Sequence, residues 1–148
     1  MLDLNRFIFE LDRLTTAVHF YDEVYCDKDA INTLGRLSNQ AAKIIQLSVH
    51  NDIVMATARL LFDGEKYKVS GKVYEYLSHY NLAKKYEKYI DSTLQIHRDR
   101  VAEIKKEINV KDYRDFVLAH NEKATLTGQN EHPKHNIETK HLLEMLQK

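Results

Sequence analysis

Chain breakers are scarce in this sequence. Only one proline and four glycines occur among its 148 residues. Proline removes a backbone donor and glycine loosens the chain, so a sequence poor in both has few positions that favour a turn. Long stretches without such residues favour helices over the many short strands of a sandwich or barrel. We therefore expect an all-α fold.

Apolar side chains recur at steps of three and four residues, which is the period of an amphipathic helix. In the first segment they are Leu4, Phe7, Ile8, Leu11, Leu14, Val18, Tyr21 and Tyr25. The same pattern predicts further helices over residues 31–62, 82–108, 110–120 and from 136 onward. Together they predict a single domain over residues 1–148, an all-α helical bundle of four to five main helices plus a short extra helix.

The boundaries between these helices follow from local signals. Asp27 or Asp29 is expected to cap the second helix by accepting a backbone N–H. That helix is predicted to be long, with a bend near "SVHND" at residues 48–52. The stretch "FDGEKYKVSGK" is interpreted as a loop, after which Ser70 is expected to cap a short helix over residues 72–80.

Composition narrows the classes of function. The 22 basic and 22 acidic residues give a net charge of zero, which argues against a broadly basic nucleic-acid surface but leaves a local basic cleft open. The single Cys26 excludes an internal disulfide and fits a reducing compartment. No apolar run reaches membrane-spanning length, and the N-terminal stretch lacks the pattern of a signal peptide. We expect a cytoplasmic protein without a membrane partner.

The stretch "YRDFVLAHNEK" at residues 113–123 contains a candidate catalytic pair, Arg114 and His120. In an α-helix six positions rotate by ~600°, which leaves the two side chains roughly 120° apart. One helix alone therefore does not bring them together. Two copies related by a two-fold axis can bring both pairs to one groove, so the spacing indicates a homodimer if the site is real.

Histidine and arginine suit metal-free RNA cleavage. A neutral imidazole accepts the proton of the ribose 2′-hydroxyl, and an imidazolium protonates the leaving oxygen. The fork of Arg114 can hold the phosphate, and a helix C-terminus at His120 favours the protonated imidazole. The plain alternative is that Arg114 is a solvated helix residue and His120 caps the helix C-terminus.

Two blocks of the sequence resemble the HEPN superfamily. Arg114, Asp115 and His120 are similar to its motif of Arg, a polar residue, a short spacer and His in a late helix. "ATARLLFDGE" at residues 56–65 resembles the RLFD block of the abortive-infection AbiU-like branch. The resemblance covers roughly residues 5 to 148.

The resemblance implies a dimeric helical bundle that acts as a metal-independent endoribonuclease in bacterial phage defence or a toxin–antitoxin system. It implies Arg114, Asp115 and His120 as catalytic residues, and Asn121 and Arg59 as substrate-binding residues. RNA is the implied substrate, and an antitoxin or another defence protein is an implied partner; no metal or cofactor is implied. Asp115 stands where active members often have Asn, and Glu122 stands where a toxin subgroup has a modifiable Tyr.

Other interpretations remain open. A non-catalytic HEPN module that binds a partner protein or nucleotide fits the neutral charge and Asp115.

Arg59 and Asp63 are predicted to form an i,i+4 ion pair at a helix end. His132, His135 and His141 are interpreted as chance histidines of a polar region rather than a zinc site, which normally needs four ligands. "KKYEKY" at residues 84–89 either supplies core tyrosines and solvated lysines or follows a nucleic-acid backbone.

Overall fold

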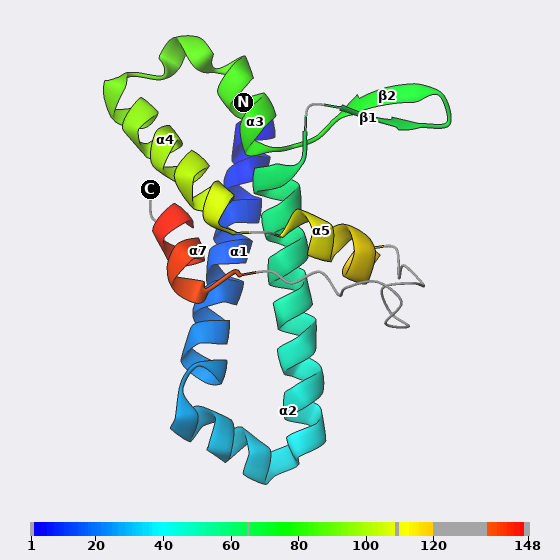
Figure 1. The fold of residues 1–148 in the computed structure, drawn as a ribbon, viewed down its shortest axis with the longest axis vertical. Helices are drawn as coiled ribbons and strands as arrows, with labels where there is room; N and C mark the ends of the chain where they lie inside the picture. The colour runs from blue at the N-terminus through cyan, green and yellow to red at the C-terminus, as the bar shows by residue number, and fades with distance from the viewer. Residues whose placement is uncertain (1, 65, 109, 120–135, 147–148) are drawn as a thin grey trace.

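Two long antiparallel helices form the centre of the molecule (Figure 1). The computed structural model describes residues 2–64, 66–108, 110–119 and 136–146. Helix α1 (Leu2–Tyr25) packs along α2 (Lys28–Thr57). Asp27 caps α2 by accepting a hydrogen bond from the Ala30 N–H at 2.7 Å. The expected first helix and the cap at Asp27 are thereby confirmed.

Helix α2 is bent at a different place from the one predicted. Residues 48–52 are helical, whereas Ser38 has φ −167° and ψ 104°. The Ser38 hydroxyl accepts a hydrogen bond from the Ala41 N–H at 3.3 Å, so it caps the second part of α2. The preference of serine for cap positions explains why the helix breaks there without any Pro or Gly.

A β-hairpin follows α2 where a loop was predicted. A π-helical turn, η1 (Ala58–Phe62), extends α2, and strands β1 (Lys66–Val69) and β2 (Lys72–Glu75) pair antiparallel. Ser70 and Gly71 both have positive φ, 48° and 78°, as a two-residue type I′ turn requires. Ser70 is thus a turn residue and not a helix cap.

The expected short helix over residues 72–80 and the continuous helix over 82–108 were also wrong in detail. Helix α3 (His79–Lys85) is capped by Ser78, and a 3₁₀ turn, η2 (Glu87–Tyr89), follows it. Helix α4 (Ser92–Glu107) then starts anew, because the Asp91 side chain caps it by accepting from the Leu94 N–H at 2.9 Å.

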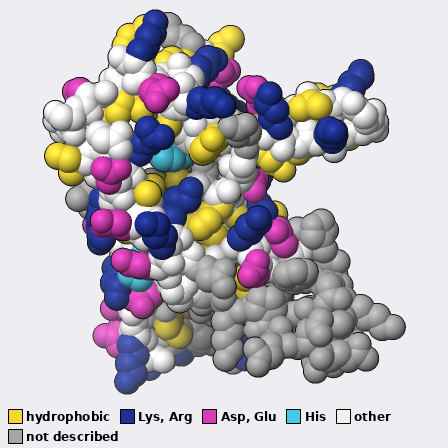
Figure 2. Space-filling view, turned by 45° about the horizontal axis from the view of Figure 1, so that its top comes forward, with side chains coloured by type: hydrophobic (Ala, Val, Ile, Leu, Met, Phe, Trp, Pro, Cys, Tyr) yellow, Lys and Arg dark blue, Asp and Glu magenta, His cyan; other side chains and the backbone are white. Residues whose placement is uncertain are grey.

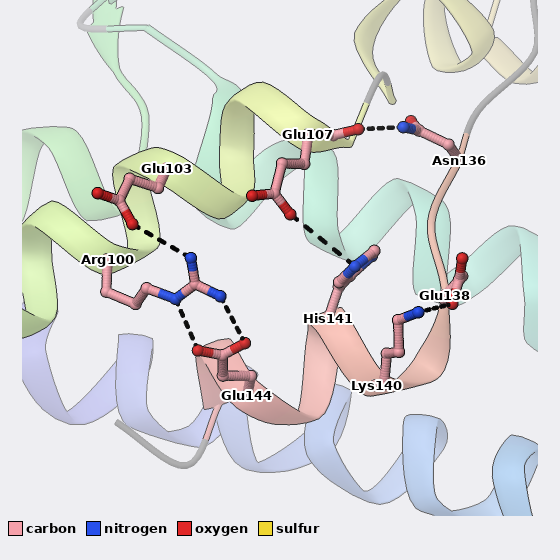
Figure 3. A network of polar contacts seen from close by, with 8 residues as sticks. All are labelled: Arg100, Glu103, Glu107, Asn136, Glu138, Lys140, His141 and Glu144. Carbon is pink, nitrogen blue, oxygen red and sulfur yellow. Dashed lines mark hydrogen bonds and ion pairs between the residues drawn. The ribbon is translucent and has the colours of Figure 1, made fainter.

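The late elements return to the two central helices. Helix α5 (Lys111–Tyr113) continues as the π-helical turn η3 (Arg114–Ala119), and α7 (Thr139–Leu146) lies against α1 and α4 (Figure 1). Arg100 of α4 donates two hydrogen bonds to the Glu144 carboxylate of α7, at 2.7 and 3.0 Å (Figure 3). Helix α7 begins three residues after the expected start near Asn136.

One core joins these helices. Its buried members are Phe7, Leu14, Val18, Ile53, Ala56, Leu60, Leu61, Leu82, Ile104, Ile108, Leu142 and Met145. They come from α1, α2, η1, α3, α4 and α7, together with Ile108 just after α4. The all-α expectation is confirmed apart from the small hairpin. No helix in the described part of the chain is long and apolar enough to cross a membrane.

Candidate functional site

The candidate site lies where the late motif helix packs on the end of α2. A small buried cluster of Val54, Ala58 and Val110, with Tyr113 and Leu118 against it, holds α5 and η3 on α2. These apolar contacts place Arg114, the first residue of η3, close to the end of η1. Segments more than 50 residues apart in the sequence are therefore brought together.

Arg114 is held by two carboxylates. Its Nη1 donates to Oδ1 of Asp63, and its Nε donates to Oδ1 of Asp115 at 2.6 Å. The exposed fractions of the Arg114, Asp63 and Asp115 side chains are 14%, 9% and 31%. The ion pair with Asp63 joins the two sequence blocks that resemble the HEPN superfamily. We call these three residues the Arg114 clamp.

The clamp fixes both the charge and the orientation of the guanidinium. Burial lowers the pKa of Arg114, but hydrogen bonds to Asp115 and Asp63 outweigh it and raise the pKa above its ordinary value. Arg114 therefore stays cationic. One guanidinium faces two carboxylates, so the clamp carries a formal charge of −1 when both acids are ionised.

The predicted ion pair between Arg59 and Asp63 is not formed. Asp63 follows η1 with extended backbone, φ −64° and ψ 138°, so α-helical i,i+4 spacing does not apply to it. Its carboxylate turns to Arg114 instead. Arg59 is exposed and has no ion pair among the described residues. Its role in substrate binding stays a prediction.

Other predicted site residues lie outside the described part of the chain. These are His120 and Asn121, and also Glu122, His132 and His135. Of the C-terminal histidines, His141 is described: its Nε2 lies 3.9 Å from Oε2 of Glu107 on α4 (Figure 3). Within the described ranges, no group of three or more His, Cys, Asp or Glu side chains is arranged to hold a metal ion.

Two basic residues near η1 were not predicted from the sequence: Lys105 on α4 and His79 on α3. The Lys105 ammonium lies 5.1 Å from the centroid of the Phe62 ring, and burial lowers the pKa of this lysine. Burial also lowers the pKa of His79, and the positive charges of Lys105 and Arg98 add to the effect. No local signal marked Lys105, because "EIKKE" has the composition of a solvated helix face.

Both resembling blocks adopt π-helical geometry. Residues Ala58–Phe62 and Arg114–Ala119 are the two π-helical turns in the residues that the structure describes. Such turns occupy well under 1% of residues in globular proteins and occur frequently at functional sites. Their coincidence with the two blocks marks this junction as the candidate functional site.

The fold and the clamp define a helical protein whose late motif arginine is tied to the end of its second helix. The AbiU2 family of HEPN proteins matches residues 3–147, almost the whole chain. The chain therefore belongs to the AbiU2 HEPN family. No curated protein and no solved structure shows a significant match.

Proposed function

We propose that this protein is a metal-independent endoribonuclease that acts as a homodimer in bacterial abortive infection or a toxin–antitoxin system. The Arg114 clamp carries the proposal together with the family. A guanidinium that binds a phosphate during catalysis must be held in one orientation, which requires neighbouring groups that fix its rotamer. Asp63 and Asp115 supply that constraint from two different elements.

In the proposed reaction Arg114 holds the scissile phosphate. Nη1 and Nε bind the two aspartates, and Nη2 has no hydrogen bond to a described residue, so Nη2 is the donor offered to a phosphate oxygen. The His120 imidazole of one copy takes the 2′-hydroxyl proton and the 2′-oxygen bonds to phosphorus. The bond between phosphorus and the 5′-oxygen breaks, and the His120 imidazolium of the other copy donates a proton to the leaving oxygen. A second copy supplies the matching His120 and Arg114 across the two-fold axis.

An RNA cleavage assay in the presence of EDTA tests this proposal. We expect His120→Ala to lower the rate by about 10²–10⁴-fold, the usual range for removing a general acid–base group, and Arg114→Ala to lower it by about 10²–10³-fold, as for a donor that stabilises the transition state. The control is His19→Ala, at an exposed position on α1, which should cleave like the wild type. Cleavage by His120→Ala at the wild-type rate would disprove the assigned chemistry.

One observation favours the alternative of a non-catalytic HEPN module. The clamp has a formal charge of −1 and the Arg114 side chain is only 14% exposed, so an incoming phosphate meets two carboxylates as well as the guanidinium. In that case Arg114 stabilises the fold and the protein binds a partner protein or nucleotide. Pure wild-type dimer without activity on mixed-sequence RNA would support this alternative.

A further inference from the structure

The hairpin β1–β2 stands away from the helical body (Figure 1). All eight of its strand residues are exposed. A two-stranded hairpin is at best marginally stable by itself in water, so this one depends on its attachment to the helical body. Its base is anchored, because the Asn81 side chain donates to the Tyr76 carbonyl at 2.8 Å. The question is which partner its side chains fit.

One face of the hairpin is aromatic. Tyr67 is paired with Tyr74 in the strand register, and Tyr76 follows on the same face. The Tyr67 ring lies 5.6 Å from Tyr74 with an interplanar angle of 27°, and 4.5 Å from Tyr76 at 33°. Tyr67 and Tyr74 are 38% and 43% exposed. The cluster thus leaves ring surface open for stacking.

The hairpin is also basic in a chain that is neutral as a whole. Its strands carry Lys66, Lys68 and Lys72 against Glu75, and Lys68 and Lys72 have no ion pair among the described residues. Residues 66–89 hold six lysines, two glutamates and six of the nine tyrosines. Figure 2 shows lysine side chains on the projecting hairpin. With three lysines against one glutamate, the hairpin is a local basic surface of the kind that the zero net charge left open.

A groove of about 520 Å³ lies at the base of the hairpin, against α3 and the start of α1. Tyr76, Lys66 and Lys84 are among its lining residues, so it continues from the tyrosine cluster. Its acids are already engaged: Glu75 lies 3.8 Å from Lys66, and Asp3 lies 2.5 Å from Lys85. The volume falls in the range of small-ligand sites, which suits one nucleotide of a longer strand.

We propose that the hairpin binds single-stranded RNA through its aromatic face, which carries Tyr67, Lys72, Tyr74 and Tyr76, and through Lys68, which lies on the opposite face at the edge strand. We call these five residues the tyrosine arm. Bases stack on exposed tyrosines whatever their sequence, and lysines neutralise the phosphates. The strands carry two exposed apolar residues, Val69 and Val73, against three lysines. Lysine is depleted in protein–protein interfaces, so this composition favours nucleic acid over an apolar protein partner. Paired bases of a duplex are not available for such stacking.

The arm is connected directly to the candidate site, and its assignment rests on the function proposed above. Strand β1 begins three residues after Asp63, which holds Arg114. Three residues of chain span at most ~11 Å, so the base of the arm lies near the clamp and one RNA strand can contact both. The arm would supply affinity and select unpaired RNA, while the clamp would act on one phosphate.

Fluorescence anisotropy with a labelled, mixed-sequence single-stranded RNA of about 20 nucleotides tests the aromatic contacts, in a His120→Ala background that prevents turnover. We expect the double change Tyr67→Ala and Tyr74→Ala to weaken binding by about tenfold or more, because each stacked base contributes substantially. The matched control, Tyr67→Phe with Tyr74→Phe, keeps both rings and should bind like the parent. Circular dichroism checks that the exposed changes leave the helices intact.

The charge contacts are tested by the salt dependence of the same binding. Lys68→Gln with Lys72→Gln should reduce the slope of log affinity against log salt by about 1.4, or ~0.7 for each phosphate contact on a single strand. Lys28→Gln with Lys43→Gln removes the same charge from exposed positions on α2 and should leave the slope unchanged.

The outcomes separate the arm from the nuclease. Single-stranded RNA binding that is lost with the tyrosines supports the arm, even if the wild type cleaves nothing. Wild-type cleavage with unchanged binding by both arm variants overturns the arm and leaves the nuclease standing. Equal binding of a duplex of the same length, or loss of self-association instead of RNA binding in the arm variants, also overturns it.

Discussion

At the scale of the residue, the properties of Arg114 depend on a partner that its sequence neighbourhood does not reveal. Spacing within "YRDFVLAHNEK" showed only that Arg114 and His120 do not share an α-helical face. The ion pair with Asp63 spans 51 positions and depends on how η3 packs on α2. The resemblance drew attention to both blocks, but the i,i+4 rule assigned Asp63 to the wrong arginine.

We expect Asp63→Asn to destabilise the protein by roughly 2 kcal/mol. Breaking a fully buried ion pair costs roughly 3–5 kcal/mol, and Asp115 remains to compensate Arg114 in part. Urea unfolding measures the change. The control is Asp52→Asn, which breaks the Arg13–Asp52 pair whose side chains are 38% and 44% exposed. That change should cost less than about 1 kcal/mol. Equal losses of stability in the two variants would show that the Arg114–Asp63 ion pair contributes no more than an exposed ion pair.

His79 should make stability depend on pH below neutrality. Its folded pKa is lowered from 6.5 by burial and by the charges of Lys105 and Arg98. The unfolded state therefore binds more protons, so the stabilising contribution is present above about pH 6.5 and is lost as pH falls through the folded pKa.

Unfolding measurements at about pH 7.5 and about pH 5.5 test this dependence. Wild type should lose more stability on acidification than His79→Gln, which cannot be protonated. His19→Gln, at an exposed position of α1, should follow the wild type. Parallel losses in wild type and His79→Gln would rule out a contribution from His79.

At the scale of the element, helices were predictable and their interruptions were less so. The apolar period located α1, which buries a stripe of four residues along its length, and α2, whose buried residues all lie in its last two turns. The hairpin had a signal that was overlooked: "KYKV" and "KVYE" alternate and flank Ser-Gly, a two-residue turn. The π-helical turns had none, because they arise where packing shifts a helix by one residue.

The kink at Ser38 supplies an element-scale prediction. Ser38→Ala removes the hydroxyl that accepts from the Ala41 N–H, so it should cost about 1 kcal/mol. Ser48→Ala, on the same helix, removes a hydroxyl that only donates back to the Ile44 carbonyl, and should change stability by less than about 0.5 kcal/mol. Thermal unfolding compares the two. A larger loss at Ser48 would contradict the capping role.

At the scale of the whole molecule, the all-α class could be predicted from the scarcity of Pro and Gly and from the helical period of apolar residues. Which segments meet at the candidate site could not be predicted in this way. Helix α7 packs on α1, and the Thr139 hydroxyl donates to Asp22 at 2.8 Å across 117 positions. The core contains residues from both ends of the described chain. Such long-range contacts depend on how several elements pack at once, and periodicity within one segment cannot specify them.

If α7 closes a single core, a cavity within it should weaken the entire fold. Leu142 is 1% exposed and belongs to the same cluster as Leu14 and Ile104. We expect Leu142→Ala to lower the free energy of unfolding by about 3 kcal/mol, within the roughly 2–5 kcal/mol observed for buried leucines. Leu37→Ala is the control, because Leu37 is 80% exposed and should change stability by less than about 0.5 kcal/mol.

Urea unfolding followed by circular dichroism and by tyrosine fluorescence measures both variants. For Leu142→Ala we expect one shifted transition that coincides for the two probes. The cavity left by the substitution would be lined by α1, α4 and α7, which we expect to unfold together. A separate early transition would instead mean that α7 detaches while α1 and α2 stay folded. The clamp and the tyrosine arm would then be independent of α7.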